Sequence, residues 1–348
     1  MTQWTDLRSL DKNELTDIIL QMGEKKYRAG QIYGWLHKKL VSSPDEMTNV
    51  PGSLLLALLK DHPFYDVKEI ERHVSGIDGT MKFLFSLHDG NVIESVLMPY
   101  KHGNSVCISS QAGCRMGCRF CASTLLGLSR NLYPSEMLGQ IYAIQKATGE
   151  RVSHVVVMGT GEPFDNFEAL CRMIDMLCHP EGLNISRRNI TVSTCGIVPK
   201  IYEFADRNPQ VTLAISLHAP DDEVRRELLP VARKYPLDEL MKAADYYVKK
   251  TGRRITFEYS LVRGNNDSPA QAKKLARLVK GMNCHINLIP VNPIRERDYR
   301  QSESRSVSEF KHFLEQEGIQ VTVRREMGRD IQAACGQLRK SYKERSGS

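Results

Sequence analysis

Strand-like and helix-like segments alternate regularly along the chain from about residue 104 onward. Short apolar runs, the candidate strands, lie at residues 105–110, 154–158, 189–194, 211–218, 255–261, 285–290 and 320–325. Longer segments with a helical apolar period separate them, at residues 134–147, 165–178, 198–205, 237–250, 268–279 and 306–317. Repeated strand–helix units form a parallel sheet covered by helices. Six units predict an α/β fold built as a partial (β/α)6 barrel of the TIM type, because a complete barrel needs eight.

Two segments of different character precede these units. Residues 1–64 hold three helix-like stretches, the first of which follows a capping Asp11, and predict a small helical domain. Residues 65–103 hold three strand-like runs separated by glycine-containing turns and predict a β-extension. We therefore predict an N-terminal helical accessory domain at 1–64, a β-extension at 65–103, a core barrel at 104–340 and a polar tail at 341–348.

Composition narrows the class of protein and its partners. The chain has no run of 18 apolar residues, and its first residues lack the basic-then-apolar pattern of a signal peptide. We therefore expect a soluble cytoplasmic protein with no membrane partner, and a monomer by default. The net charge of +7 fits a polyanionic partner such as RNA.

Three closely spaced cysteines follow the first candidate barrel strand. Cys114, Cys118 and Cys121 are separated by three and then two residues, so their thiolates can converge on one face of a metal centre. In a cytosolic enzyme, clustered cysteines indicate metal or redox chemistry more often than disulfides. A structural zinc site needs a fourth protein ligand, whereas three cysteines suit a [4Fe–4S] cluster with one open iron. A zinc-stabilised RNA-binding protein without catalysis is the alternative.

Other polar motifs lie where further candidate strands end. In parallel barrels the active residues gather at the carboxyl ends of the strands. The motifs are Gly159-Thr160-Gly161-Glu162-Pro163, Ser193-Thr194, Ser216-Leu217-His218 and Asn292. The sequence therefore predicts one site at this end of the barrel, next to the cysteine loop.

The motifs together resemble the RlmN branch of the radical S-adenosylmethionine (SAM) superfamily, and the resemblance spans nearly the whole chain. It rests on the loop from Cys107 to Cys121 with Phe120 before its last cysteine, and on residues 158–163, 216–219, 289–293 and 330–338. RlmN enzymes methylate carbon 2 of a specific adenosine in 23S rRNA and of the adenosine 3′ of the anticodon in some tRNAs. The related Cfr enzymes methylate carbon 8, and that activity is the alternative. Pro163 after Glu162 favours the carbon-2 branch, because carbon-8 relatives tend to have alanine there.

The resemblance also implies cofactors and residue roles. It implies one [4Fe–4S] cluster per chain on Cys114, Cys118 and Cys121, two SAM molecules per turnover, and an electron donor such as flavodoxin or ferredoxin. It places SAM against Gly161, Glu162, Ser193, Ser216, Leu217, His218 and Asn292. Cys335 would take a methyl group from one SAM, and a 5′-deoxyadenosyl radical from the second would activate that methyl. Cys107 would then release the product by forming a transient disulfide with Cys335. Glu94 matches the position of the base that removes the carbon-2 proton, with water as the alternative.

Basic residues lie next to these motifs in the sequence, and the remaining cysteines fall outside them. We expect RNA contacts from Arg115, Arg119, Arg130, Arg295, Arg297, Arg300, Arg324, Arg325 and Arg329, because neutralised phosphates dominate affinity for RNA. Cys171, Cys178, Cys195 and Cys284 lie in apolar patterns, and we predict that they are structural.

Overall fold

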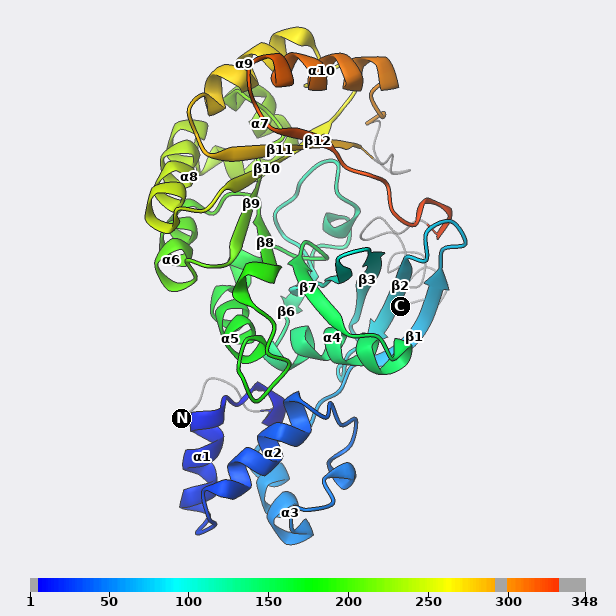
Figure 1. Ribbon diagram of the computed structural model, residues 1–348, viewed down its shortest axis with the longest axis vertical. Helices are drawn as coiled ribbons and strands as arrows, with labels where there is room; N and C mark the ends of the chain where they lie inside the picture. The colour runs from blue at the N-terminus through cyan, green and yellow to red at the C-terminus, as the bar shows by residue number, and fades with distance from the viewer. Residues whose placement is uncertain (1–5, 292–298, 332–348) are drawn as a thin grey trace.

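A ten-stranded sheet organises the computed structural model, which describes residues 6–291 and 299–331. Its strand order is β1-β2-β3-β4-β7-β8-β9-β10-β11-β12 (Figure 1). From β4 to β12 every neighbouring pair is parallel, whereas β1 to β4 pair antiparallel. The strands are β1 (Lys68–Val74), β2 (Met81–Ser86), β3 (Val92–Tyr100), β4 (Gly103–Cys107), β7 (Val152–Val157), β8 (Ile190–Thr194), β9 (Thr212–Ser216), β10 (Ile255–Leu261), β11 (Cys284–Pro290) and β12 (Val321–Val323).

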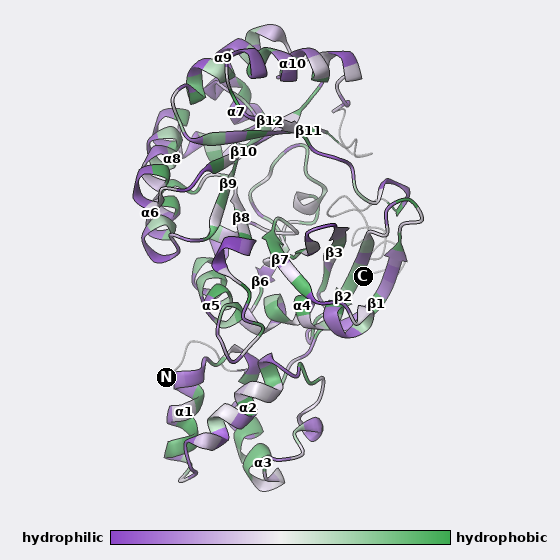
Figure 2. Ribbon diagram, in the orientation of Figure 1, coloured by the Kyte–Doolittle hydropathy of each residue, from purple (hydrophilic) through white to green (hydrophobic). Residues whose placement is uncertain are grey.

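Helices connect the successive parallel strands and cover the outside of the sheet (Figure 1). The connecting helices are α4 (Pro134–Thr148), α5 (Phe167–Leu177), α6 (Val198–Arg207), α8 (Leu237–Thr251), α9 (Pro269–Val279) and α10 (Ser304–Gln316). In Figure 2 α6 and α8 alternate between hydrophobic and hydrophilic colouring, as expected for helices that bury one face. The predicted strand–helix units and the partial barrel are therefore confirmed.

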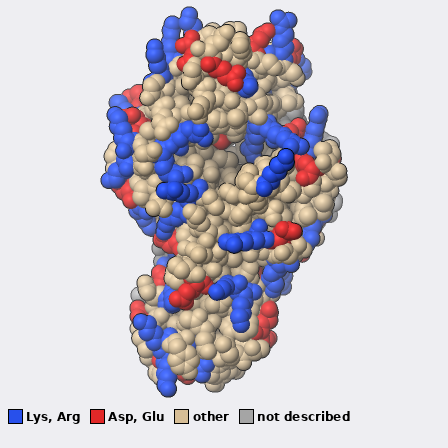
Figure 3. Space-filling view, viewed as in Figure 1, with Lys and Arg blue, Asp and Glu red and all other residues tan. Residues whose placement is uncertain are grey.

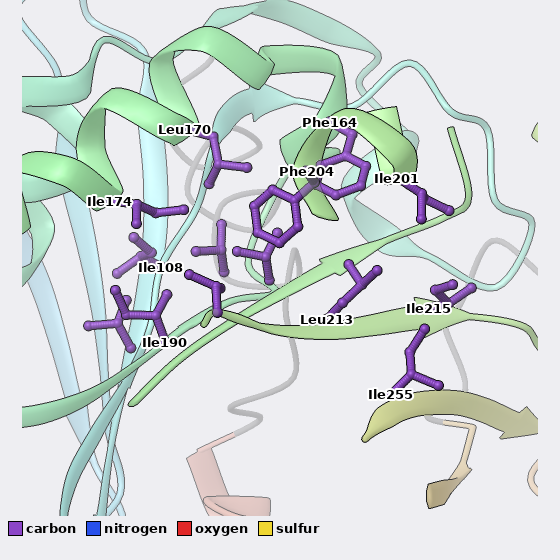
Figure 4. Close-up of a cluster of buried hydrophobic side chains, with 14 of the residues drawn as sticks. Ile108, Phe164, Leu170, Ile174, Ile190, Ile201, Phe204, Leu213, Ile215 and Ile255 are labelled. Carbon is purple, nitrogen blue, oxygen red and sulfur yellow. The ribbon is translucent and has the colours of Figure 1, made fainter. Parts of the chain in front are cut away.

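The main core lies between this helical layer and the parallel strands. In Figure 4 side chains from the strands face aromatic and aliphatic side chains of α5, α6 and the turn before α5. All of the labelled residues are at most 2% exposed: Ile108, Phe164, Leu170, Ile174, Ile190, Ile201, Phe204, Leu213, Ile215 and Ile255. Full burial of one such side chain contributes about 1.5–3 kcal/mol. This packing holds the strand ends, and hence the motifs, in fixed positions.

The N-terminal helices α1 (Lys12–Gln21), α2 (Tyr27–His37) and α3 (Gly52–Asp61) enclose a separate hydrophobic cluster. Asp11 caps α1 as predicted, through a capping box with Glu14. Arg8 ties this unit to the rest of the chain: its guanidinium pairs with Asp66 at 2.6 Å and lies over the rings of Phe64 and Tyr142.

Some elements differ from the sequence prediction. The short hairpin of β5 (Gln111–Gly113) and β6 (Leu128–Asn131) and the helix α7 (Asp222–Leu228) were not predicted. Three- and four-residue strands carry too little apolar periodicity to be recognised. The strand predicted at 105–110 begins and ends earlier, as β4. Among the described residues no helix is both long and apolar enough to cross a membrane.

Candidate active site

One cavity of about 220 Å³ collects side chains from most of the predicted motifs. It lies where the parallel strands end, as the barrel geometry predicts. Its lining includes Cys114, Cys118, Cys121, Gly161, Glu162, Ser193, Ser216 and His218. Met116, Phe120, Thr194, Glu258, Ser260 and Arg324 complete much of the wall. The structure thus brings together residues that lie up to 210 positions apart (324 − 114 = 210).

The cysteine loop is fixed by backbone hydrogen bonds rather than by packing alone. Cys114 N–H donates to the Gly127 carbonyl at 3.0 Å, and Arg119 N–H donates to the Leu228 carbonyl at 3.0 Å. The Thr124 hydroxyl donates to the carbonyls of Cys118 and Cys121, at 3.2 and 2.9 Å. These bonds hold the three thiols on one side of the cavity.

The three thiols fit a metal cluster by donor type. Burial raises the pKa of Cys114 to about 12 and raises the pKa values of Cys118 and Cys121, so these thiols stay protonated until a metal binds. A bound metal reverses this preference, because it coordinates the thiolate form. Among the residues described, no three His, Cys, Asp or Glu side chains form a preformed metal site.

The glycine-rich turn after β7 packs against residues 108–111, which lead into the cysteine loop. A Cβ atom on Gly159 would lie 2.6 Å from the Ile108 carbonyl oxygen, and one on Gly161 would lie 2.8 Å from the Gln111 nitrogen. Between them, the Thr160 carbonyl accepts the N–H groups of Ser110 and Gln111, at 2.9 and 3.1 Å. The two glycines are needed because two backbones meet here without space for side chains.

Glu162 is buried at the edge of the cavity, and both of its carboxylate oxygens accept backbone amides. Cys195 N–H donates to Oε2 at 2.7 Å, and Phe164 N–H donates to Oε1 at 2.9 Å. Burial raises the pKa of the Glu162 carboxyl, and these hydrogen bonds only partly offset that effect. Glu162 therefore links the ends of β7 and β8.

His218 is held as a neutral imidazole in an unusual backbone conformation, with φ of 56°. Ser260 N–H donates to Nδ1 at 2.9 Å, which leaves the ring proton on Nε2. Burial lowers the pKa of His218 to about 3, and its ring packs edge-on against Phe120 at 4.7 Å. Leu217, predicted with it, packs its side chain into the main core. Its N–H donates to the Glu258 carbonyl at 3.0 Å, and its carbonyl accepts Arg225 Nε at 3.3 Å.

Glu258 is a cavity residue that sequence reasoning missed. In the sheet it lies in register with Ser216 of β9 and Asn287 of β11, and the Asn287 amide donates to its Oε2 at 2.8 Å. Burial raises the pKa of its carboxyl. Its place in the cavity could have been predicted from the polar residues Thr256, Glu258 and Ser260, which alternate with apolar ones along the strand. Alternate residues of a strand face the same side, here the barrel interior.

Cys107, Val96 and Lys82 occupy matching positions on β4, β3 and β2. Cys107 is half-buried, which raises the pKa of its thiol, whereas the nearby Arg324 guanidinium and the Met158 N–H lower it. Glu94, two residues before Val96, is only 2% exposed and pairs with Lys82 at 3.1 Å. The structure thus gives Glu94 a buried cationic partner. Asn292 and Cys335, also predicted at this site, lie outside the described residues.

Basic side chains surround the cavity, and some of them are already paired with acids. Figure 3 shows Lys and Arg on both sides of a hollow near the centre of this face. Arg115 pairs with Asp165, and Arg130 pairs with Asp89 and Glu136. Exposed at this end are Arg119, Arg300, Arg324, Arg325 and Arg329, whereas Arg295 and Arg297 lie outside the described residues.

A second cavity, of about 670 Å³, lies at the amino end of β11 between α9 and α10. It is larger than the first, but its described lining, which includes Lys273, Arg277 and Phe313, contains none of the motif residues. We therefore assign the candidate site to the smaller cavity.

Comparisons with known proteins agree on the relatives of this chain. Residues 108–276 match the radical SAM superfamily, and residues 5–60 match the ribosomal RNA large subunit methyltransferase N-terminal domain. A probable dual-specificity RNA methyltransferase RlmN from Lachnospira eligens is 60% identical over 340 residues, covering 98% of this chain and 97% of that protein. Another from Lachnoclostridium phytofermentans is 57% identical over 346 residues, covering 99% and 97%. The crystal structure of a radical SAM methyltransferase from Sphaerobacter thermophilus superposes with a TM-score of 0.90 at 44% identity, covering 96% and 98%.

Proposed function

Because this chain belongs to the RlmN family of radical SAM RNA methyltransferases, we propose that it methylates carbon 2 of adenosine. Its substrates would be a specific adenosine in 23S rRNA and the adenosine 3′ of the anticodon in some tRNAs. The observation that supports this most directly is the cavity that gathers three thiols, Glu162 and His218 at the strand ends. Carbon 2 lies between two ring nitrogens and is too electron-poor to attack a methyl donor. A radical route does not need carbon 2 to act as a nucleophile. The protein then has to position the reactants and shield them from solvent.

In this proposal, Cys114, Cys118 and Cys121 hold one [4Fe–4S] cluster per chain. A cluster held there, and reduced by a donor such as flavodoxin or ferredoxin, would supply the electron for SAM cleavage. Two SAM molecules are used per turnover. The residues that would hold SAM, as the family resemblance implies, are Gly161, Glu162, Ser193, Ser216, Leu217, His218 and Asn292.

Cys335 and Cys107 would carry the covalent steps. The Cys335 thiolate would take a methyl group by displacement and present it to the target base. Cys107 would attack the Cys335 sulfur, forming a disulfide and releasing the methylated base, and an external thiol would reset the pair. Burial raises the pKa of the Cys107 thiol, and the nearby Arg324 guanidinium opposes that rise, since a positive charge favours the thiolate.

Glu94 would accept the carbon-2 proton. Its burial beside Lys82 keeps it away from bulk water, and it lies two residues before Val96, which pairs with Cys107 in the sheet. A carboxylate that is fixed and shielded from water is suited to remove a proton from an adenine bound next to Cys107.

RNA would bind across the basic rim of the cavity, with the target base unstacked to enter it. Arg119, Arg324 and Arg325 are exposed there and are the rim residues we favour for phosphate contacts. We propose that the enzyme acts in the cytoplasm, where translation uses rRNA and tRNA.

The decisive experiment is an anaerobic reaction of the reconstituted protein with SAM, a reductant and unmodified 23S rRNA fragment or tRNA. Nucleosides from the digested RNA are then identified by mass spectrometry. A 2-methyladenosine product supports the proposal, and comparison of the two RNAs gives the substrate range. An 8-methyladenosine product would keep the radical mechanism but replace the carbon-2 assignment. No product, together with zinc in place of iron, would favour a non-catalytic RNA-binding protein.

A further inference from the structure

The segment after β12 is hydrogen-bonded to the tip of the β1–β2 hairpin. Ser75 Oγ donates to Asp330 Oδ1 at 2.7 Å, and Gly76 N–H donates to Asp330 Oδ2 at 2.9 Å. Gly328 N–H donates to Asp78 Oδ2 at 3.0 Å. We call these five residues the edge clasp. Figure 1 shows the red segment leaving β12 and reaching the loop between β1 and β2.

The edge clasp joins the two free edges of the sheet. β1 and β12 are the first and last strands in the strand order, so the sheet leaves its barrel open between them. The three bonds connect residues 250 to 255 positions apart in the sequence. Such a long-range connection closes only when the rest of the fold already places both ends together.

The hairpin side of the edge clasp is preorganised by its own turn. Ser75 N–H donates to the Thr80 carbonyl at 2.8 Å, and Thr80 N–H donates to Asp78 Oδ1 at 3.0 Å. Asp78 therefore uses one carboxylate oxygen to build the turn and the other to hold Gly328. Partial burial alone would raise the pKa of Asp78, but the hydrogen bonds from Gly328 and Thr80 lower it to about 2. The Ser75 hydroxyl and the Gly76 amide likewise lower the pKa of Asp330.

From this geometry we propose that the edge clasp is a positioning device for Cys335, and this rests on the proposed role of that cysteine as methyl carrier. Asp330 is five residues before Cys335, so the thiol stays within roughly 17 Å of the clasp. Without the clasp, the last sheet hydrogen bond is Arg324 N–H to the Leu288 carbonyl at 2.8 Å, eleven residues before Cys335. The clasp shortens the tether that carries the reactive sulfur.

The length of the tether sets the size of the expected effect. Effective concentration falls roughly as the −3/2 power of tether length, so lengthening it from five to eleven residues lowers it about threefold. The step affected is methyl loading, in which the Cys335 thiolate forms a carbon–sulfur bond. SAM leaves as S-adenosylhomocysteine, the thiol proton goes to solvent, and no electron is transferred. Opening the clasp should slow this step about threefold.

The test compares the holoenzyme with Asp330→Asn and Asp330→Ala, which remove the charge-assisted bonds at an exposed position. Glu326→Gln is the matched control, because Glu326 loses the same charge in the same segment but pairs with Arg329 at 3.7 Å. Hydrogen exchange at Gly76 reports whether the clasp is open. Mass spectrometry of the Cys335 peptide gives the rate of methyl loading from SAM without RNA. Iron content and melting temperature show whether the fold and cluster are intact.

We expect faster Gly76 exchange and about threefold slower methyl loading in both Asp330 variants. Iron content and melting temperature should be unchanged, and the control should behave like wild type. Faster Gly76 exchange with an unchanged loading rate would overturn the positioning role. Gly76 exchange that stays at the wild-type rate in both Asp330 variants would also overturn it. A separate arm tests the underlying premise in the wild type and in Cys335→Ala. If the wild-type peptide is never methylated while Cys335→Ala still methylates RNA, the proposed role of Cys335 fails, and the positioning role fails with it. The exchange data distinguish that case from failure of the clasp alone.

Discussion

Lys82 and Glu94 form a 3.1 Å ion pair inside the β-extension, with side chains only 1% and 2% exposed. They come from adjacent strands, where Leu84 of β2 lies opposite Glu94 and Lys82 lies opposite Val96. Val96 lies between Lys82 and Cys107 in the sheet, and Glu94 is two residues before Val96, so both charges are close to Cys107 in the sheet. This arrangement has consequences for both stability and catalysis.

Removing one partner of this ion pair should destabilise the protein more than removing both. A lone buried charge costs about 3–5 kcal/mol, whereas replacing a whole buried pair by apolar residues is often neutral or stabilising. We expect Lys82→Met to lower the free energy of unfolding by that amount, and Lys82→Met with Glu94→Leu to recover most of it. Urea denaturation measures both, with exposed Lys68→Met as the control. Equal destabilisation by the single and double variants would contradict an energetically coupled pair.

Glu94→Gln should slow product formation while leaving RNA binding intact. A positioned general base typically contributes 10²–10⁴-fold, so the single-turnover rate should fall by about 100-fold or more. Iron content confirms that the cluster is retained, and Glu69→Gln on the exposed side of β1 is the control. A rate within about threefold of wild type would mean that water removes the proton.

Cys107→Ala and Cys335→Ala should fail at different steps. Without Cys335 no methyl carrier remains, so methylated adenosine should be absent from the digested RNA. Without Cys107 the carrier is intact but the product is not released, so a covalent protein–RNA adduct should accumulate on denaturing gels. Cys178→Ala, at the end of α5, is the control for loss of a structural thiol. A Cys107→Ala protein that turns over without adduct would remove that residue from the mechanism.

His37 should make stability depend on pH between neutrality and mild acid. Burial, assisted by Arg8 and His179, lowers the pKa of His37 to about 3, against an ordinary value of 6.5. The unfolded chain therefore binds a proton that the folded chain does not, so stability is complete above pH 6.5 and declines as pH falls toward 3. Between pH 7.5 and 5.5 His37 should cost about 1.4 kcal/mol, measured by urea denaturation. His37→Phe should remove that part of the slope, whereas exposed His312→Asn should leave it unchanged.

The architecture could be predicted from the sequence because its signals are local. The apolar strand at 255–261 and the helix at 134–147 are specified by the residues within them, and the structure places β10 and α4 there. The spacing of Cys114, Cys118 and Cys121 requires their side chains to share one loop. Because parallel strands share one carboxyl end, the positions of Glu162 and His218 at a common site also followed from the sequence.

The partners of these side chains were decided only by the tertiary structure. The sequence left Glu94 as one acidic residue on a strand, and the register of β2 with β3 supplied Lys82. Leu217 belonged to a motif, yet its side chain faces the core, while Glu258, outside every motif, faces the cavity.

The edge clasp shows the physical reason for this division. A turn such as Ser75 to Thr80 can be recognised from its own residues, but its contact with Asp330 depends on the curvature of the sheet between β1 and β12. The period of apolar residues depends only on neighbours in the sequence, and it was enough to predict most of the strands and helices. Hydrogen bonds and ion pairs between distant residues exist only after register and curvature bring the two edges of the sheet together.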